Sequence, residues 1–339
     1  MKVLITGGAG LVGSECCRLF AQEGYQVTSV DNYLRGKLFG QDGNTRSTIE
    51  QLLHDIPEMA HFEVDIRDTE KMRSLIENTD IIIHTAAQPS HPKSIEIPLE
   101  DFSINTYGTL NLLELVRCHK PDATFIYCST NKVYGDLPNY FPIVEKENRY
   151  DFRDIDGIDE SCPIDQCMHT PFGVSKAAAD LYVQEYGRLY GLKTGVFRMG
   201  CITGSAAKAV EMHNWEPFFV KKNLLGEALH IYGYKGKQVR DVIHARDLAK
   251  LLLRFAESPR PGEVYNIGGG RQNSISLLEA FDLIESITGK PMYYDFQTAR
   301  EGDHIVYVSD LSKVKQHFNW DISIGLKEIF SEIYQAIIK

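Results

Sequence analysis

The sequence predicts an α/β fold built on a doubly wound parallel sheet, with a second, smaller domain toward the C-terminus. Short apolar runs alternate with amphipathic stretches up to residue 199, and a glycine-rich turn follows the first run. After residue 199 the periodicity weakens. Strands that alternate with helices are typical of parallel sheets, because each crossover between parallel strands needs a covering helix.

The elements follow in order along the chain. Apolar runs indicate buried strands over residues 2–6, 26–30, 80–85, 123–128 and 193–198, and helical patterns lie at 13–24, 106–119 and 175–191. Two long polar stretches, 32–60 and 136–171, interrupt this pattern and are typical of functional loops or decorations. We expect one domain from 1–198 with 236–268 and a smaller one from 199–235 with 269–339.

Composition and net charge exclude several classes of protein. The net charge is −10 and the pI about 5.6, with no basic tract, so we expect no nucleic-acid partner. No apolar run approaches the ~18 residues of a membrane span, and the chain starts directly with a strand rather than a signal peptide. Seven cysteines without paired spacing indicate reduced thiols and no metal site. These features predict a cytoplasmic protein.

The first strand leads into a GxxGxxG turn formed by Gly7, Gly10 and Gly13. Such a turn lets the backbone approach a pyrophosphate at a helix N-terminus. Asp31 ends the second strand, where a carboxylate would bind the ribose hydroxyls and repel a 2′-phosphate. The pattern therefore favours NAD over NADP, although Arg35 nearby keeps NADP open. The alternative is a glycine turn with a structural role alone.

Further segments extend this pattern: DIRD at 65–68, HTAAQ at 84–88, INTYGT at 104–109, STNKVYGD at 129–136 and FGVSK at 172–176. With them the chain resembles the extended short-chain dehydrogenase/reductase family, which acts mostly on nucleotide sugars. The resemblance implies a Rossmann domain that binds NAD. It assigns the following residues to the cofactor: Gly7, Gly10, Leu11, Val12, Asp31, Asn32, Arg35, Asp65, Ile66, Ala86, Ala87, Asn105 and Lys176.

The resemblance also implies the catalytic residues. Thr130 matches the catalytic Ser/Thr, and Lys176 matches the lysine that binds the nicotinamide ribose. Phe172 stands where the family has the tyrosine that passes a proton, and phenylalanine has no ionisable group. Three explanations are open: a Tyr→Phe replacement introduced into an active parent, a natural variant that moves its proton through Thr130, Lys176 or His169, and a silent nucleotide-sugar binder. His169 is also compatible with a solvent-facing loop position.

Other residues bear on the reaction. Dehydratases of the family carry an Asp-Glu pair after the catalytic threonine, whereas this chain has Asn131 and Lys132, which disfavours a dehydratase. The segments STNKVYGD, GKQVRD and YNIGGG are similar to the epimerase branch that inverts C2 of CDP-linked sugars for lipopolysaccharide or other surface polysaccharides. That similarity implies an isomerase in which NAD is recycled. A 4-epimerase or a dehydrogenase acting on another nucleotide sugar is the alternative.

Two arginines match family positions that grip the diphosphate of the substrate, Arg240 and Arg300. Arginine suits this role because its fork binds two phosphate oxygens at once. Surface salt bridges are the alternative interpretation. We place Thr130 and Asn131 at the sugar. The family further implies a homodimer or homotetramer, formed through helices predicted at 101–118 and 172–191.

Overall fold

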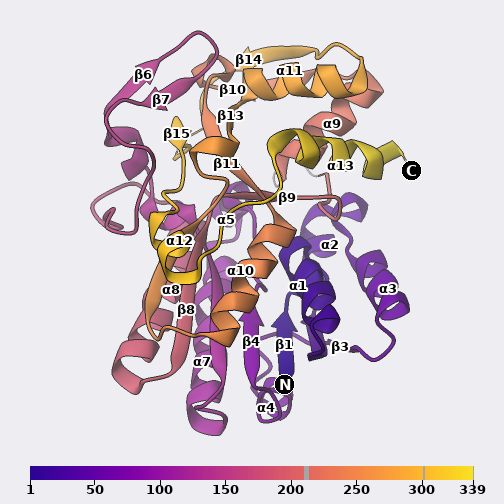
Figure 1. The fold of residues 1–339 in the computed structure, drawn as a ribbon, viewed down its shortest axis with the longest axis vertical. Helices are drawn as coiled ribbons and strands as arrows, with labels where there is room; N and C mark the ends of the chain where they lie inside the picture. The colour runs from indigo at the N-terminus through magenta and orange to yellow at the C-terminus, as the bar shows by residue number, and fades with distance from the viewer. Residues whose placement is uncertain (210–213, 301, 339) are drawn as a thin grey trace. The chain divides into compact units, whose positions relative to one another are not determined.

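The computed structural model describes residues 1–209, 214–300 and 302–338 and divides into two compact units (Figure 1). The first comprises 1–133, 170–198 and 248–265, and the second comprises 134–169, 199–247 and 266–339. This division differs from the predicted one, because segments 134–169 and 236–247, together with residues 266–268, belong to the second unit. Both segments take part in that unit's hydrogen bonding, as when the Tyr150 amide donates to the Lys237 carbonyl at 2.8 Å.

The first unit contains the predicted doubly wound sheet. Seven strands follow the order β12-β8-β5-β4-β1-β2-β3, and the register pairs Val3 with both Val27 and Ile81 in parallel. The order reverses at β1 and β4, and ligands of such sheets bind outside the carboxyl ends of the strands at that point. The bounds are β1 Lys2–Thr6, β2 Gln26–Asp31, β3 Ala60–Glu63, β4 Ile81–His84, β5 Thr124–Thr130, β8 Lys193–Met199 and β12 Glu263–Ile267.

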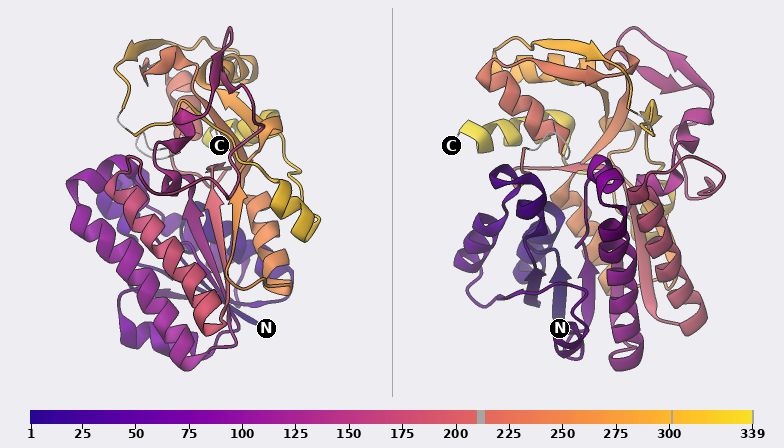
Figure 2. Two further views of the ribbon diagram at one scale, coloured as in Figure 1. Left: turned by 90° about the vertical axis from the view of Figure 1, so that its left-hand side faces the viewer. Right: turned by 180° about the vertical axis from the view of Figure 1, so that it is seen from behind.

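Helices cover both faces of this sheet. Figure 2 shows α7 and α8 on one side of the strands and α10 on the other. The core between them is apolar, with Leu4, Ile82 and Phe125 fully buried. The helical bounds are α1 Leu11–Gln22, α2 Leu34–Phe39, α3 Arg46–Asp55, α4 Thr69–Ile76, α5 His91–Glu96, α6 Pro98–Phe102, the π-helical turn η2 Ser103–Tyr107, α7 Gly108–His119, α8 Pro171–Tyr190 and α10 Ala245–Glu257, with short 3₁₀ turns at Gln41–Gly43 (η1) and Asn131–Tyr134 (η3).

The five predicted strands are confirmed with small shifts at their ends. Residues 32–60 differ from expectation, since they hold α2, η1 and α3 and lead into β3. The strand β3 escaped prediction because it is short, lies at the sheet edge and is largely exposed. Helix α8 begins at Pro171, so Phe172 and Lys176 lie one turn apart on the same helix.

The second unit combines small sheets with three packed helices. Strand β11 pairs with β13, β15 and β9, and β10 pairs with β14. Phe219, Phe281 and Phe330 form the centre of its core, contributed by α9, α11 and α13 in turn. The bounds are β6 Ile143–Glu145, β7 Tyr150–Phe152, β9 Cys201–Thr203, α9 Trp215–Leu225, β10 Leu229–Tyr232, β11 Val239–His244, β13 Ser274–Ser276, α11 Leu277–Thr288, β14 Tyr294–Gln297, β15 Val306–Tyr307, α12 Ser312–Phe318 and α13 Leu326–Ile338, with 3₁₀ turns η4 Leu137–Tyr140, η5 Tyr234–Gly236 and η6 Arg271–Asn273.

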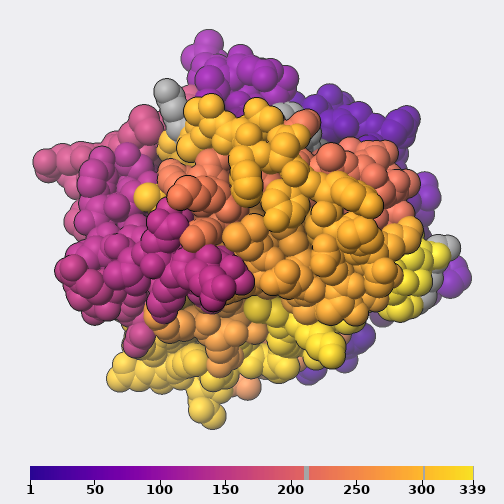
Figure 3. All heavy atoms as spheres, turned by 90° about the horizontal axis from the view of Figure 1, so that it is seen from above, coloured from indigo at the N-terminus to yellow at the C-terminus, as the bar shows by residue number. Residues whose placement is uncertain are grey.

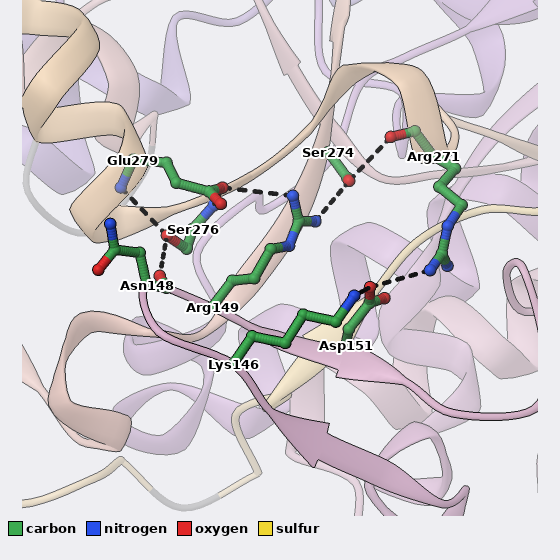
Figure 4. Close-up of polar contacts among 8 residues, drawn as sticks. All are labelled: Lys146, Asn148, Arg149, Asp151, Arg271, Ser274, Ser276 and Glu279. Atoms are coloured by element: carbon green, nitrogen blue, oxygen red, sulfur yellow. Dashed lines mark hydrogen bonds and ion pairs between the residues drawn. The ribbon is translucent and has the colours of Figure 1, made fainter.

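A polar cluster fixes the hairpin β6–β7 within the second unit. Arg149 donates to Ser274 Oγ at 2.7 Å and lies 3.3 Å from Glu279, while Asp151 accepts from Lys146 and Arg271 (Figure 4). Figure 3 shows this hairpin segment, in magenta, beside the orange segment that carries α11. The polar stretch 136–171 is therefore anchored in part by ion pairs rather than by an apolar core.

Across the described ranges, no helix is long and apolar enough to cross a bilayer. In the same ranges, no cluster of His, Cys, Asp or Glu side chains could hold a metal ion.

Candidate active site

The glycine turn after β1 forms a cradle at the point where the strand order reverses. Gly7 has φ +71°, and a Cβ there would lie 2.7 Å from the Ala86 amide nitrogen, which follows β4. A Cβ on Gly13 would lie 2.2 Å from the Gly7 carbonyl oxygen. At Gly10 a Cβ would meet only that same oxygen, at 3.1 Å, within a 4 Å range. Two glycines thus permit close packing, and the third leaves one side of the turn open.

Helix α1 starts immediately after this turn. Gly10 is its N-cap residue, and no side chain caps the amides of its first turn, which includes Leu11 and Val12. Amides at a helix N-terminus attract an anion through their hydrogens and the helix dipole. The turn and the helix end therefore suit a pyrophosphate.

Asp31 lies beside the turn, as predicted. Its carboxylate accepts from the Ala9 amide at 3.0 Å and from the Tyr33 amide at 2.8 Å. Burial raises the pKa of Asp31 above its ordinary value, and these amide hydrogen bonds oppose the rise only in part. Each carboxylate oxygen has a second lone pair, so the group retains acceptor capacity for ribose hydroxyls.

Asn32 and Asp65 are brought together at the ends of β2 and β3. Asn32 Nδ2 donates to Asp65 at 2.9 Å, and Arg67 forms a fork with both oxygens of the same carboxylate, at 2.9 and 2.7 Å. The hydrogen bond from Arg67 is the main cause that lowers the pKa of Asp65 to about 2. Asp65 is thus a fixed anion, and the partnership with Arg67 was not expected from the sequence.

The segment after β4 is tied to α8 through Asn105. Asn105 accepts from the Gln88 amide at 2.9 Å and donates to Ser175 Oγ at 3.1 Å. It lies in the π-helical turn η2, a conformation that is frequent at functional sites. Asn105 is buried, so it positions the two segments that flank the predicted cofactor site, including Ala86 and Ala87.

The remaining predicted cofactor residues lie around the same sheet edge. The Arg35 guanidinium lies 5.4 Å from the centre of the Phe39 ring, and burial lowers the pKa of Arg35 to about 10. Ile66 is buried, and a Cβ on Gly108 would lie 2.6 Å from its Cδ1. Ile66 therefore packs against the start of α7.

Lys176 is buried on α8 and faces the last residues of β5. Its Nζ donates to the Cys128 carbonyl at 2.8 Å and lies 4.3 Å from the centre of the Tyr127 ring. Desolvation lowers the pKa of Lys176 to about 8, against smaller opposing effects from Cys128, Asp180 and Asp101. The amine is therefore close to its titration point near neutral pH.

Thr130 ends β5, two residues beyond Cys128. Its hydroxyl donates to Asn131 Oδ1 at 3.4 Å and accepts from the Lys132 amide at 3.2 Å. Thr130 is half-buried, and Asn131 is buried. The structure thus brings Thr130 and Lys176 to the same strand end, one at its tip and the other against its side.

Phe172 occupies the first turn of α8 and is buried. Its amide donates to Ser94 Oγ at 3.0 Å, which fixes the start of the helix. His169 belongs to the second unit and contacts Cys167, with Sγ 3.6 Å from Nδ1.

Asp180 is a positioning residue that sequence reasoning missed. It is fully buried one turn beyond Lys176, and accepts from Ser129 Oγ at 2.7 Å and from Arg198 at 3.0 Å. Arg198 forms a buried ion pair with Asp180. The pair joins α8, β5 and β8, and its only sequence signal is an acidic residue within an apolar helical pattern.

The arginines predicted at the substrate lie in the second unit. Arg240 forms an ion pair with Asp303 at 2.7 Å, and the Arg300 guanidinium lies 3.8 Å from the centre of the Tyr232 ring. Trp215 packs edge-on against Phe219 within the core of that unit. Core packing therefore accounts for these two aromatic residues.

The model of the NAD dependent epimerase/dehydratase family matches residues 3–268. The chain belongs to this family. Members of the NAD-dependent epimerase/dehydratase family use the cofactor that the glycine cradle, the uncapped helix end and Asp31 fit. The similarity extends beyond the matched range to nearly the whole chain in individual relatives.

Among these relatives, CDP-paratose 2-epimerase of Salmonella typhi is 37% identical over 347 residues, covering 98% of each chain. UDP-glucose 4-epimerase of Homo sapiens is 27% identical and covers 98% of this chain and 95% of its own length. A crystal structure of UDP-glucose 4-epimerase with UDP-glucose from Thermotoga maritima superposes with a TM-score of 0.83 at 26% identity, covering 100% of this chain and 99% of that one. The Thermus thermophilus UDP-glucose 4-epimerase, solved with NAD, gives 0.82 at 25% identity with the same coverage.

Proposed function

We propose that the chain is an NAD-dependent nucleotide-sugar epimerase that inverts C2 of a CDP-linked sugar in the cytoplasm. The observation that carries this proposal is the arrangement of three features within one unit. The glycine cradle lies where the strand order reverses, the Asp31 carboxylate lies beside that cradle, and Lys176 contacts the strand β5 that Thr130 ends. The identity to CDP-paratose 2-epimerase supports the sugar position and the base.

In this proposal each site residue has a separate role in binding or in the reaction. Gly7, Gly10 and Gly13 admit the pyrophosphate, and Asp31 binds the ribose hydroxyls. When bound, NAD supplies a reversible acceptor for the hydride of the sugar carbon. Lys176 binds the nicotinamide ribose beside the reacting oxygen of the sugar, and Thr130 forms a hydrogen bond with that oxygen.

Asn131 and Lys132 support an epimerase over a dehydratase. Elimination of water needs an acid and a base beside the sugar, and neither an amide nor an ammonium replaces the Asp-Glu pair of dehydratases. The similarity to dTDP-glucose 4,6-dehydratases, 29% identity for that of Escherichia coli strain K12, leaves the family assignment unchanged. We assign Arg240 and Arg300 to the diphosphate, with Asp303 holding Arg240 in place.

Phe172 favours a second candidate, a weakly active binder of NAD and nucleotide sugars. Loss of a positioned proton acceptor typically costs about 10²–10⁴ in rate. This candidate and the epimerase bind the same molecules and differ in turnover.

Incubation with CDP-, UDP-, GDP- and dTDP-sugars in heavy water, followed by NMR, tests the proposal. We expect a mixture of C2 isomers from a CDP-sugar, with no net NADH and no deuterium at C2, because the hydride returns to the same carbon. Net NADH would indicate a dehydrogenase instead. Binding without any isomer would favour the silent binder, and a large gain in Phe172→Tyr would point to a replaced tyrosine.

We also propose that two copies associate through α8. Val174, Leu181, Tyr182 and Leu189 are exposed apolar residues on this helix, and their spacing places them on one face. Leu99 of α6 is also exposed, at 85%. A second copy would cover this apolar α8 face.

Light scattering of the eluted protein tests this association. Leu181→Glu should convert a dimer or tetramer into a smaller species, because it places a charge within the apolar α8 face. Leu225→Glu is the matched control, since Leu225 is exposed at the end of α9 and should leave the mass unchanged. A Leu181→Glu variant with unaltered mass would argue against the interface.

A further inference from the structure

With Phe172 in place of tyrosine, the candidate active site lacks the family's usual proton acceptor. The amine of Lys176 lies one helical turn away. The two side chains lie four positions apart on α8, so they share a face of the helix. Both are buried, with Phe172 8% exposed and Lys176 4% exposed. The ring of Phe172 neither accepts nor donates a proton.

The surroundings of Lys176 stabilise the ammonium form of its amine less than water does, because the amine is buried. Among the described residues, Nζ has one hydrogen-bond partner, the uncharged Cys128 carbonyl, and its contact with the Tyr127 ring is a cation–π contact rather than an ion pair. Within the described residues, no carboxylate lies at ion-pair distance from Nζ. An amine in such surroundings is less costly to bury when it is uncharged.

The ionisable groups that face Lys176 from the packed elements are engaged elsewhere. On α8 itself, Asp180 forms an ion pair with Arg198. On α6, Asp101 accepts hydrogen bonds from Gln88, Asn105 and Ser175.

The other groups are neutral. Burial raises the pKa of the Cys128 thiol to about 12 and also raises that of the Tyr127 hydroxyl. Burial lowers the pKa of His84 on β4 to about 3, with a smaller contribution from the charge of Lys176. Neither the carboxylates nor these groups supply a strong partner for an ammonium ion at position 176.

We propose that Lys176 itself exchanges the proton with the sugar hydroxyl, in the role that tyrosine has at position 172 in relatives. This proposal rests on the proposed epimerase function. As the sugar C–H bond breaks and its hydrogen leaves with the electron pair to NAD, the hydroxyl proton moves to neutral Nζ and the C–O bond becomes a carbonyl. On return, the ammonium gives the proton back to oxygen as the hydride returns to the opposite face of the carbon.

Thr130 does not replace Lys176 in this step. Its hydroxyl donates to the Asn131 amide oxygen, which is not a base. Thr130 therefore has no basic neighbour at that oxygen to which it could pass a proton taken from the sugar. His169, three positions before Phe172, is the alternative proton acceptor that the test must separate from Lys176.

The first test measures the protonation state of Lys176 without any turnover. Lysines labelled with ¹³C at Cε are titrated by NMR in the protein saturated with NAD, and Lys176→Met identifies the signal. We expect a midpoint near 8 or below, against about 10.4 for exposed lysines. A Lys176 signal that remains that of an ammonium ion at pH 10 overturns the proposal.

The second test follows the reaction. The turnover rate should rise with pH as Lys176 loses its proton. This rising limb of the pH–rate profile should persist in His169→Gln. Lys176→Ala should lose about 10²–10⁴ in rate and regain part of it with small primary amines, more so with more basic amines. A structural role or ribose binding alone would give no such dependence on amine basicity.

The failures are distinguishable. If the unmodified chain forms no isomer from any nucleotide sugar, the epimerase function fails and the proton role fails with it. If isomers form, but the limb disappears in His169→Gln and amines do not restore Lys176→Ala, the proton role of Lys176 alone is overturned.

Discussion

Replacement of Asp180 by asparagine will measure how much the buried ion pair contributes to the first unit. Asp180 is fully buried and accepts from Arg198 Nε and NH2 at 3.0 Å each, from Ser129 Oγ at 2.7 Å and from Gln184 Nε2 at 2.6 Å. Asparagine has nearly the same shape but turns one acceptor into a donor. It also leaves the Arg198 guanidinium buried and without its counter-charge.

The expected loss is large. Removal of one partner of a buried ion pair costs about 3–5 kcal/mol, against a total stability of about 5–15 kcal/mol. With a urea m-value of about 2–3 kcal/mol per M, the unfolding midpoint of Asp180→Asn should fall by about 1–2.5 M. Urea unfolding followed by circular dichroism measures this shift.

The pair formed by Arg46 and Glu63 provides a matched control. It has the same fork geometry, with distances of 3.1 and 2.9 Å, but its side chains are 51% and 54% exposed. Water screens such a pair, so Glu63→Gln should leave the midpoint unchanged. Equal midpoints for the two variants would refute the argument that the Asp180 pair stabilises the fold more than an exposed pair because it is buried.

Three further predictions concern the cofactor and the hairpin. Gly13→Ala should weaken NAD binding about 5- to 150-fold, measured by calorimetry. The added Cβ would lie 2.2 Å from the Gly7 carbonyl oxygen, and overpacking of this kind costs about 1–3 kcal/mol. An unchanged affinity would contradict the assignment of the glycine turn to the pyrophosphate. Asp31→Ser should raise the affinity for NADP relative to NAD, because it removes a charge that repels the 2′-phosphate; an unchanged ratio would place the ribose elsewhere. Burial raises the pKa of Asp151, but Lys146 and Arg271 together lower it by more than burial raises it. The pKa of Asp151 in the folded chain therefore lies below its ordinary value. Its contribution to stability should therefore be complete above the unfolded pKa of about 3.9 and disappear as pH falls through the lower folded pKa. The stability difference between the unmodified chain and Asp151→Asn, measured in urea, should shrink over that range.

Local patterns were sufficient to predict much of the fold and of the cofactor cradle. The strand before Gly7 and the helix after Gly13 are contiguous in sequence, and periodicity identifies both. Asp31 follows from its place at the end of an apolar run. In each case the residues that interact are close along the chain or belong to one repeated βα unit.

Long-range contacts could not be predicted in this way. Asp180 meets Ser129 across 51 positions, and Arg149 meets Ser274 across 125. Neither pairing leaves a periodic signal, because a buried polar group is defined by its partner and not by its neighbours in sequence. The division into units differs from the predicted one for the same reason, since segment 134–169 is joined to β13 and α11 by such contacts.

Position 172 departs from the YxxxK pattern in its side chain, and its backbone lies in the first turn of α8. Pro171 begins α8, the Phe172 amide is held by Ser94, and Lys176 follows one turn later against Cys128, so the backbone keeps the relation that the YxxxK pattern requires. What is missing is a hydroxyl group. Lys176 is the one ionisable side chain of the YxxxK pattern that remains. We therefore assign the proton transfer to Lys176.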